Sequence, residues 1–343
     1  MNEDLVIIFC MTFFKNTIDV RHLSKRYGRV QAVKDVSFTV SKGEVVGLLG
    51  PNGAGKSTTM RILCGLVSAN SGEAYVCGIS VARYPEDVKR RVGCMLENNP
   101  LPEDLRVLEY LRLRARLKGV ASRQICQRVD EVMDVCDLNR TARDRIIGRL
   151  SKGYQQRIGI ADAVLSNPDV IVMDEPTIGL DPYQIIATRE LIRTLRGKMA
   201  VMLSSHVLPE IELCCDRFLI INHGHIVADG TPAELRAAFV PTVTYRLTAK
   251  GPLASLKTAL ANIDPQLELI VCGEADEEGF YAAEVEAPRG VDIGTVLIRR
   301  FVRHPRLSLK ALAILEPRLE AVFMAATKRS WEESVDVLVR EKL

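Results

Sequence analysis

Short apolar runs alternate with helical stretches along residues 17–235, and this rhythm predicts an α/β domain. Three of the runs are continuously apolar, as is typical of strands buried on both faces of a parallel sheet. These runs are Glu44–Leu49, Val170–Asp174 and the run MAVMLSS that ends at Ser205. Two more strands are expected at Ile18–His22 and Ala32–Val40, and a helix is expected from Lys56 to about Val67.

Between about Pro102 and Asn139 the pattern changes to helix only. Apolar residues recur there at helical spacing, in one series from Leu105 to Leu117 and in a second from Ile125 to Cys136. This pattern predicts a helical insertion within the α/β domain. Further along the chain, Phe218–Asp229 is expected to form a hairpin.

The character of the sequence changes again after Pro241. Alternating and helical segments follow one another in the order β-α-β-β-α-β-α, which predicts a small α+β domain. We therefore divide the chain into an N-terminal extension, residues 1–16, an α/β domain, residues 17–238, and an accessory α+β domain, residues 239–343. The helical insertion is expected at about 98–160.

Composition narrows the class of protein. The 343 residues carry 46 Lys and Arg against 43 Asp and Glu, a net charge of +3, so charge alone does not favour a nucleic-acid or membrane-surface binder. Hydrophobic residues make up 47% of the chain, which excludes disordered and collagenous classes. The nine cysteines include no CxxC pair and no Cys/His spacing that suits zinc, so they are expected to be reduced thiols.

The longest apolar run near the N-terminus, Leu5–Phe14, is shorter than the roughly 20 residues that a membrane span needs. It follows an acidic start, whereas a signal peptide begins with positive charge. We expect an over-long translation start with Met11 as the true beginning; a membrane-touching segment is the alternative.

A phosphate-binding loop is the most specific motif in the chain. The run GPNGAGKS matches G-x-x-x-x-G-K-[ST] and lies directly between a predicted strand and a predicted helix. Its backbone N–H groups and the helix N-terminus form an anion cradle, Lys56 can reach the β- and γ-phosphates, and the Ser57 hydroxyl can bind Mg²⁺. The candidate nucleotide-binding residues of this segment are Gly50, Asn52, Gly53, Ala54, Gly55, Lys56, Ser57 and Thr58.

Such a loop needs a second metal-binding carboxylate, and the buried strand Val170–Asp174 supplies it. Asp174 is the candidate Mg²⁺ ligand, directly or through water. Glu175 follows where the chain leaves the sheet, in a position to activate water for attack on the γ-phosphate.

With these motifs in place, residues 17–235 resemble the ABC ATPase family. Further motifs occur in the family's order: the run LSKGY resembles the ABC signature, Asp181 lies in a D-loop-like TIGLDP, and His206 stands at the switch-histidine position. The resemblance implies an α/β P-loop NTPase cassette with a RecA-like core, an antiparallel β subdomain and a helical subdomain. It assigns Ser151, Gly153 and Asp181 to nucleotide binding, Tyr27 to stacking on adenine, Glu97 to the Q-loop as a metal ligand, and catalytic roles to Lys56, Glu97, Glu175 and His206.

The sequence departs from the family pattern at two motifs. LSKGY replaces the commoner LSGGQ, so that Lys152 stands for a glycine and Tyr154 for an amide, and Glu97 stands for the usual Gln. A carboxylate can still bind Mg²⁺ or orient water, but it donates a hydrogen bond only when protonated. Lys152 either adds a cation near the phosphates or is solvated.

The resemblance implies the ATP-binding and ATP-hydrolysing subunit of an ABC exporter, similar to the ATPases of gliding-motility, drug and polysaccharide export. ATP and Mg²⁺ are the implied cofactors. The implied partners are a separately encoded integral membrane permease and a second cassette, identical or paralogous, with no nucleic acid expected. This places the protein in the cytoplasm, peripheral on the cytoplasmic face of the membrane. The C-terminal region resembles the accessory tail of this exporter group.

Two alternatives belong to other classes of protein. A soluble ABC ATPase acting on ribosomes or DNA is disfavoured by the single P-loop and the absence of CxxC. A degenerate cassette is disfavoured because the P-loop lysine, both acids and the histidine are present. Basic residues in the helical insertion form either a solvated face or a contact with the permease; they are Arg106, Arg112, Arg114, Arg116, Lys118, Arg123 and Arg128.

Overall fold

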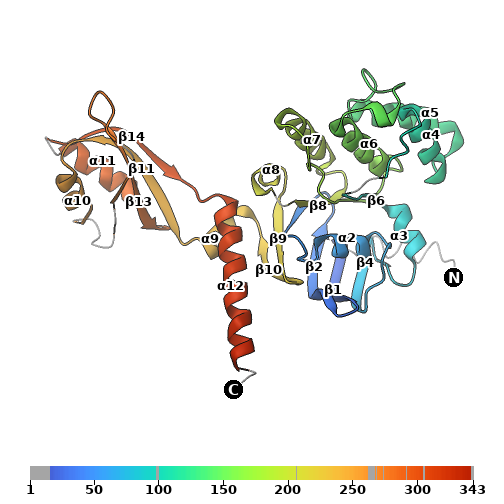
Figure 1. The fold of residues 1–343 in the computed structure, drawn as a ribbon, viewed down its shortest axis with the longest axis horizontal. Helices are drawn as coiled ribbons and strands as arrows, with labels where there is room; N and C mark the ends of the chain where they lie inside the picture. Colours follow the sequence, from blue (N-terminus) through green and yellow to red (C-terminus); the bar gives the residue numbers. More distant parts are fainter. Residues whose placement is uncertain are drawn as a thin grey trace. The chain divides into compact units, whose positions relative to one another are not determined.

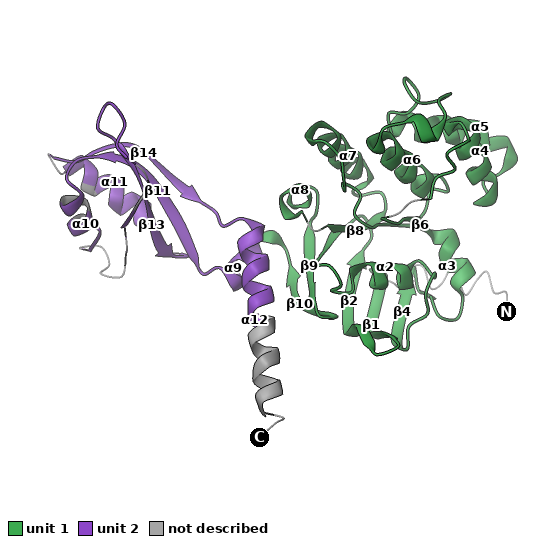
Figure 2. Cartoon of the chain, viewed as in Figure 1, with its two compact units in different colours: residues 1–232, 330–343 green, residues 233–329 purple. Residues whose placement is uncertain are grey.

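A computed structural model describes residues 16–97, 100–205, 207–261, 267, 269–272, 274–290, 292–303 and 306–340. The chain divides into two compact units (Figure 2). The first unit comprises the residues up to Pro232 together with Ser330–Leu343, and residues Ala233–Arg329 make the second. The N-terminal extension expected at 1–16 lies outside the described residues except for its last residue.

A six-stranded sheet forms the centre of the first unit, with strand order β10-β9-β3-β8-β7-β6 (Figure 1). Its neighbouring strands are parallel except for the antiparallel pair β9 and β10. The strands are β3 (Val45–Leu49), β6 (Val92–Met95), β7 (Val170–Met173), β8 (Ala200–Ser205), β9 (Arg217–Asn222) and β10 (His225–Gly230). Because β3, β7 and β8 are buried along their whole length, their continuous apolar runs are explained.

A four-stranded antiparallel sheet, order β2-β1-β4-β5, packs beside this centre. Its strands are β1 (Asn16–Tyr27), β2 (Val30–Ser41), β4 (Ser71–Val76) and β5 (Ile79–Ser80). One hydrophobic cluster joins its inner face to helix α2 and the central sheet. The first two strands are longer than the expected Ile18–His22 and Ala32–Val40, since they continue past the apolar residues to a tight turn at Gly28, whose φ is +56°.

Helix α2 (Lys56–Leu63) begins as expected but ends one turn before Val67. The reason is Gly65, whose φ of +66° lies in the left-handed region that ends helices. The other helices around the central sheet are α3 (Pro85–Arg91), α7 (Pro182–Leu195) and α8 (Leu208–Glu212).

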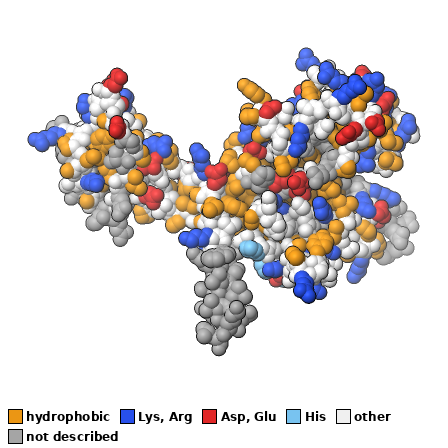
Figure 3. Space-filling model, in the orientation of Figure 1, with side chains coloured by type: hydrophobic (Ala, Val, Ile, Leu, Met, Phe, Trp, Pro, Cys, Tyr) orange, Lys and Arg blue, Asp and Glu red, His pale blue; other side chains and the backbone are white. Residues whose placement is uncertain are grey.

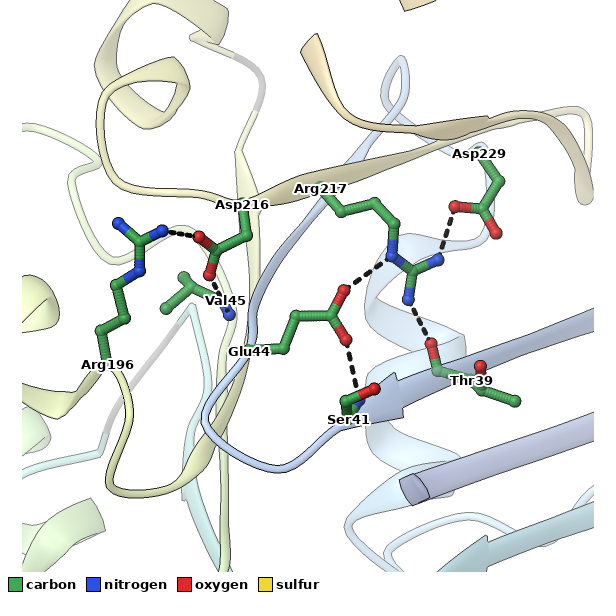
Figure 4. Close-up of polar contacts among 8 residues, drawn as sticks. All are labelled: Thr39, Ser41, Glu44, Val45, Arg196, Asp216, Arg217 and Asp229. Atoms are coloured by element: carbon green, nitrogen blue, oxygen red, sulfur yellow. Dashed lines mark hydrogen bonds and ion pairs between the residues drawn. The ribbon is translucent and has the colours of Figure 1, made fainter. Parts of the chain in front are cut away.

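A polar network ties the two sheets together (Figure 4). Arg217 pairs with Glu44 at 2.7 Å and with Asp229 at 2.5 Å, and it also donates to the carbonyl of Thr39 in β2. Glu44 in turn accepts from the backbone N–H of Ser41 at 2.7 Å. The guanidinium therefore joins strands of both sheets. Neighbouring contacts in the same view involve Val45, Arg196 and Asp216.

The helical insertion consists of α4 (Val107–Leu117), η1 (Ser122–Gln124), α5 (Ile125–Val135), η2 (Ile147–Arg149) and α6 (Lys152–Val164), and its three α-helices gather together (Figure 1). Buried Asp162 on α6 accepts two hydrogen bonds from Arg114, at 2.9 and 3.0 Å, and lies 3.3 Å from the amine of Lys118. Arg128 donates to carbonyl groups at the end of α6. The expectation of one solvated or partner-binding basic face is thus wrong for these three cations, because they hold the insertion's helices together.

The second unit has a four-stranded antiparallel sheet of order β12-β13-β11-β14 with its own hydrophobic core. After α9 (Pro232–Phe239), its elements follow in the predicted order β-α-β-β-α-β-α. They are β11 (Thr242–Lys250), α10 (Leu253–Ala261), β12 (Leu269–Cys272), β13 (Tyr281–Pro288), α11 (Ile293–Arg303), β14 (Ser308–Leu315) and α12 (Leu319–Arg340). Among the described residues, no helix is both long enough and apolar enough to cross a membrane.

Candidate nucleotide site

The predicted phosphate loop lies between β3 and α2. Gly55 has φ +111°, and a Cβ at this position would lie 2.4 Å from the carbonyl oxygen of Ala32, so only glycine fits. No side chain caps the start of α2, which leaves the N–H groups of its first turn available to an anion. The other candidate residues of the loop differ in exposure: Asn52 and Gly53 are exposed, Gly50 and Ala54 are buried, and Ser57 and Thr58 are half-buried.

Lys56 is buried at the first position of α2, with 6% of its surface exposed. Its amine donates to the carbonyl oxygens of Gly50 at 2.7 Å and Pro51 at 3.2 Å. Burial lowers the pKa of this amine, while the charges of Glu175, Asp174 and Glu97 oppose that shift. The adjacent Asp174 and Glu175, and Glu97 from a distant part of the sequence, are therefore close enough for their charges to act on this amine.

Asp174 and Glu175 follow strand β7 and are joined by a serine from the neighbouring strand β8. Ser204 donates its hydroxyl proton to Asp174 Oδ1 at 2.5 Å and accepts the backbone N–H of Glu175 at 2.9 Å. Glu175 has φ +52°, a conformation that side chains other than glycine seldom adopt and that marks functional sites. Ser204 thus holds both acids, a role that the sequence analysis missed; the only signal was a polar pair ending a buried apolar strand.

The acids leave room for a cation. Asp174 Oδ2 is buried and has no hydrogen-bond partner within the part of the chain that the structure describes. The described residues contain no group of three or more acidic, His or Cys side chains that could hold a metal. Mg²⁺ usually takes one or two carboxylates and completes its coordination shell with phosphates, hydroxyl groups and water. The unpaired Asp174 oxygen and the hydroxyl of Ser57, the second residue of α2, are therefore of the kinds that suit a nucleotide-bound Mg²⁺.

Two other predicted residues, Glu97 and Tyr27, are exposed. Glu97 is exposed just beyond the end of β6, within range of the charge on Lys56. Tyr27 ends β1 with 46% of its surface exposed, and the amine of Lys25 lies 5.1 Å from the centre of its ring. An exposed aromatic ring flanked by a cation suits stacking on a planar base. His206, the predicted switch residue, lies outside the described residues.

The signature residues begin helix α6. Ser151 is exposed at the N-cap position, but its side chain does not cap the helix, and Gly153 is buried. Tyr154, which replaces the usual amide, is turned toward the insertion instead: its hydroxyl lies 2.8 Å from that of Thr141. The exposed N-terminus of α6, with the Ser151 hydroxyl beside it, can accept an anion from outside the molecule.

Asp181 begins helix α7 and accepts the backbone N–H of Gln184 at 2.9 Å. The Gln184 side chain reaches back toward the N–H of Asp181, which completes a capping box. In the structure this carboxylate is therefore a helix cap, and its predicted nucleotide contact is not part of the described geometry.

Comparison with known proteins identifies the family in which this site occurs. The family model described as ABC transporter matches residues 33–178. The chain is 31% identical over 314 residues to the linearmycin resistance ATP-binding protein LnrL of Bacillus subtilis, covering 91% of this chain and 99% of that protein. It is 38% identical over 271 residues to the Nod factor export ATP-binding protein I of Burkholderia lata, covering 77% and 88% of the two chains.

Solved structures agree with the fold of the first unit. A structure of the ATP-binding subunit of an ABC transporter has a TM-score of 0.60 at 34% identity and covers 65% of this chain and 93% of its own. A dimeric bacterial ABC transporter cassette has a TM-score of 0.57 at 26% identity, with 62% and 98% covered. A dimeric cassette in a post-hydrolysis state bound to ADP and phosphate scores 0.57 at 25% identity, covering 62% and 98%.

Proposed function

Given that the chain belongs to the ABC transporter family and is an ATP-binding, ATP-hydrolysing subunit, we propose that it is the motor of an ABC exporter. Two similar proteins are named for export and for drug resistance, which favours outward transport. Two observations carry the proposal. Lys56 is buried at the start of an open anion cradle. Ser204 joins Asp174 to the backbone of Glu175, and the buried Oδ2 of Asp174 has no partner among the described residues.

In the proposed reaction, the N–H groups of the loop and the amine of Lys56 bind the β- and γ-phosphates. Asp174 and Ser57 hold the Mg²⁺ that neutralises charge on the phosphates, and Glu97 contributes at its edge. Glu175 accepts a proton from the attacking water, with its backbone fixed by the Ser204 hydroxyl. We propose that His206 contacts the γ-phosphate.

We propose that two cassettes act together, head to tail. Dimeric cassettes among similar structures support this arrangement. In such a pair, Ser151 and the N–H of Gly153 bind the γ-phosphate held by the partner's loop, which explains why the N-terminus of α6 is left uncapped by a side chain. The second cassette is a copy of this chain or a paralogue.

The proposed partner in the membrane is a separate permease, reached on the cytoplasmic face. Lys and Arg gather over the helical insertion (Figure 3). Since Arg114, Lys118 and Arg128 are engaged inside the insertion, the candidates for this contact are the exposed Arg112, Arg116 and Arg123.

The test is ATP hydrolysis by purified protein, compared with Glu175→Gln and with Glu212→Gln, an acidic residue of α8 outside the site. Glu175→Gln is expected to lower kcat by about 100-fold or more, as loss of a general base does, and to trap an ATP-bound dimer in size-exclusion chromatography. Turnover of Glu175→Gln at the parent rate would refute its role as the base. Co-purification of a membrane-spanning permease from solubilised membranes tests the transporter role.

A further inference from the structure

Lys152 stands at the first position of helix α6, where the commoner signature sequence has glycine. A positive charge at a helix N-terminus gains nothing from the helix dipole, which favours anions there. No ion pair joins Lys152 to any acidic side chain in the ranges that the structure describes. The location of its long side chain therefore needs another explanation.

The side chain lies across the D-loop. A Cβ built on Gly179 would lie 2.7 Å from Lys152 Nζ and 3.2 Å from both Cδ and Cε. The last three heavy atoms of the lysine thus pass directly over this glycine, whose φ is +70°. A side chain at position 179 would require the end of the exposed Lys152 side chain to shift, so the lysine packs in this position because residue 179 is glycine.

A second contact joins the same two segments. A Cβ built on Gly153 would lie 2.5 Å from Cδ of Gln184, the residue that completes the capping box with Asp181. The start of α6 therefore packs on the D-loop at Gly179 and on the first turn of α7.

The D-loop is in turn continuous with the catalytic glutamate. The N–H of Ile178 donates to the carbonyl of Glu175 at 3.2 Å, and the N–H of Leu180 donates to that of Thr177 at 3.3 Å. These two consecutive turns make the segment from Glu175 to Gly179 compact. These turns offer a short backbone route from Gly179 to Glu175, whose φ of +52° is unfavourable for a residue other than glycine.

We propose that Lys152 is a positioning residue for hydrolysis: its side chain packs on Gly179 and holds the D-loop, and with it Glu175, in the arrangement that activates water. This inference rests on the proposed function. Because the signature binds the partner's nucleotide in the proposed dimer, the same contact links closure over one nucleotide to the glutamate that acts on the other. The lysine works through packing of its stem, not through its charge on a phosphate.

Three single variants separate these roles by steady-state ATP hydrolysis. Lys152→Gly removes the stem, Lys152→Met keeps most of it without the charge, and Lys198→Gly removes an exposed lysine after α7 as a control. Lys152→Gly is expected to lower kcat by about tenfold with the KM for ATP within about twofold, as loss of catalytic positioning does. Lys152→Met and Lys198→Gly are expected to stay near the parent. A Lys152→Met as slow as Lys152→Gly, or a raised KM in both, would assign the role to the charge and overturn the proposal.

A double-mutant cycle with Gly179→Ala tests the contact itself. Gly179→Ala adds the colliding Cβ and a backbone strain at positive φ, and the strain is common to both backgrounds. Its effect on kcat is therefore expected to be smaller in Lys152→Gly than in the parent; equal effects would overturn the contact. A parent protein that hydrolyses no ATP would contradict the proposed function as well, whereas an active parent with an unchanged Lys152→Gly contradicts only the positioning role.

Discussion

At the scale of single residues, the candidate site depends on hydroxyl and backbone groups as much as on its charged side chains. Lys56 donates two hydrogen bonds to carbonyl groups of its own loop. Ser204 donates to the Asp174 carboxylate and accepts the backbone N–H of Glu175. The side chains of Lys56 and Asp174 and the backbone of Glu175 are therefore held in place before any nucleotide binds, which reduces the ordering that binding requires.

Ser204→Ala tests this orientation. The change leaves the buried Asp174 Oδ1 without its donor and the N–H of Glu175 without its acceptor. Leaving such groups unpaired is expected to lower the free energy of unfolding by about 1–3 kcal/mol, and to lower kcat for ATP. Denaturant titration and ATPase assays measure both. The matched control is Ser205→Ala, whose hydroxyl bonds to the backbone of Val207 and, within the described ranges, to no acidic side chain. Equal stability of the two variants would contradict the bridging role.

The cysteines give a prediction about pH. Burial raises the pKa of Cys77 to about 11 from its ordinary 9.0. Between these values the unfolded chain releases the proton and the folded chain keeps it, so the free energy of unfolding falls as pH rises through this window. We expect a fall of up to about 1.4 kcal/mol per pH unit from this group. Cys77→Ser, measured by urea denaturation from pH 8 to 10.5, should lose this part of the slope.

The raised pKa of Cys77 also predicts slow alkylation of this thiol. At pH 8.5 iodoacetamide should label the exposed Cys126 and Cys272 within the time in which Cys77 and the deeply buried Cys136 stay unmodified, because the thiolate is the reacting form. Mass spectrometry of the digested protein identifies the labelled sites. Protein labelled in urea, where all four should react, is the control.

At the scale of secondary-structure elements, the network around Arg217 joins strands that are far apart in sequence. Arg217→Met removes the cation that pairs with Glu44. The Glu44 side chain is only 18% exposed, so water cannot fully replace this partner. Loss of a partner in a largely buried pair is expected to cost about 2–3 kcal/mol. Arg90→Met, which breaks a pair with Asp87 that is exposed on both sides, should lower the free energy of unfolding much less. Chemical denaturation of the two variants compares them, and equal costs would contradict the stabilising role of the network.

Elements with a strong local signal could be predicted from the sequence, and contacts between them could not. The apolar run of β3 and the glycine pattern after it fix a strand, a loop and a helix start without any tertiary information. Strand β4, Ser71–Val76, was missed because half of its residues are exposed at the surface and carry little apolar pattern. The pairing of Arg114 with Asp162 was missed because the two residues are separated by 48 positions and meet only through packing of α4 on α6.

At the scale of the whole molecule, the chain consists of two units with separate hydrophobic cores. Such a chain is expected to unfold in two thermal transitions. Leu23→Ala removes a fully buried side chain from the first core, and Leu247→Ala does the same in the second. Each is expected to cost about 2–5 kcal/mol and to lower only the transition of its own unit.

Nucleotide binding then identifies which thermal transition belongs to the first unit. Only the first unit carries the phosphate loop, so a slowly hydrolysed ATP analogue with Mg²⁺ should raise the transition that Leu23→Ala lowers and leave the other in place. At 100 times its Kd the analogue should add about 2.7 kcal/mol to that unit. Differential scanning calorimetry of the parent and both variants, with and without the analogue, measures this. The contrary outcome is a single transition that both substitutions and the analogue shift together. It would mean that the two units unfold cooperatively, so that nucleotide binding also stabilises the second unit, despite its separate core.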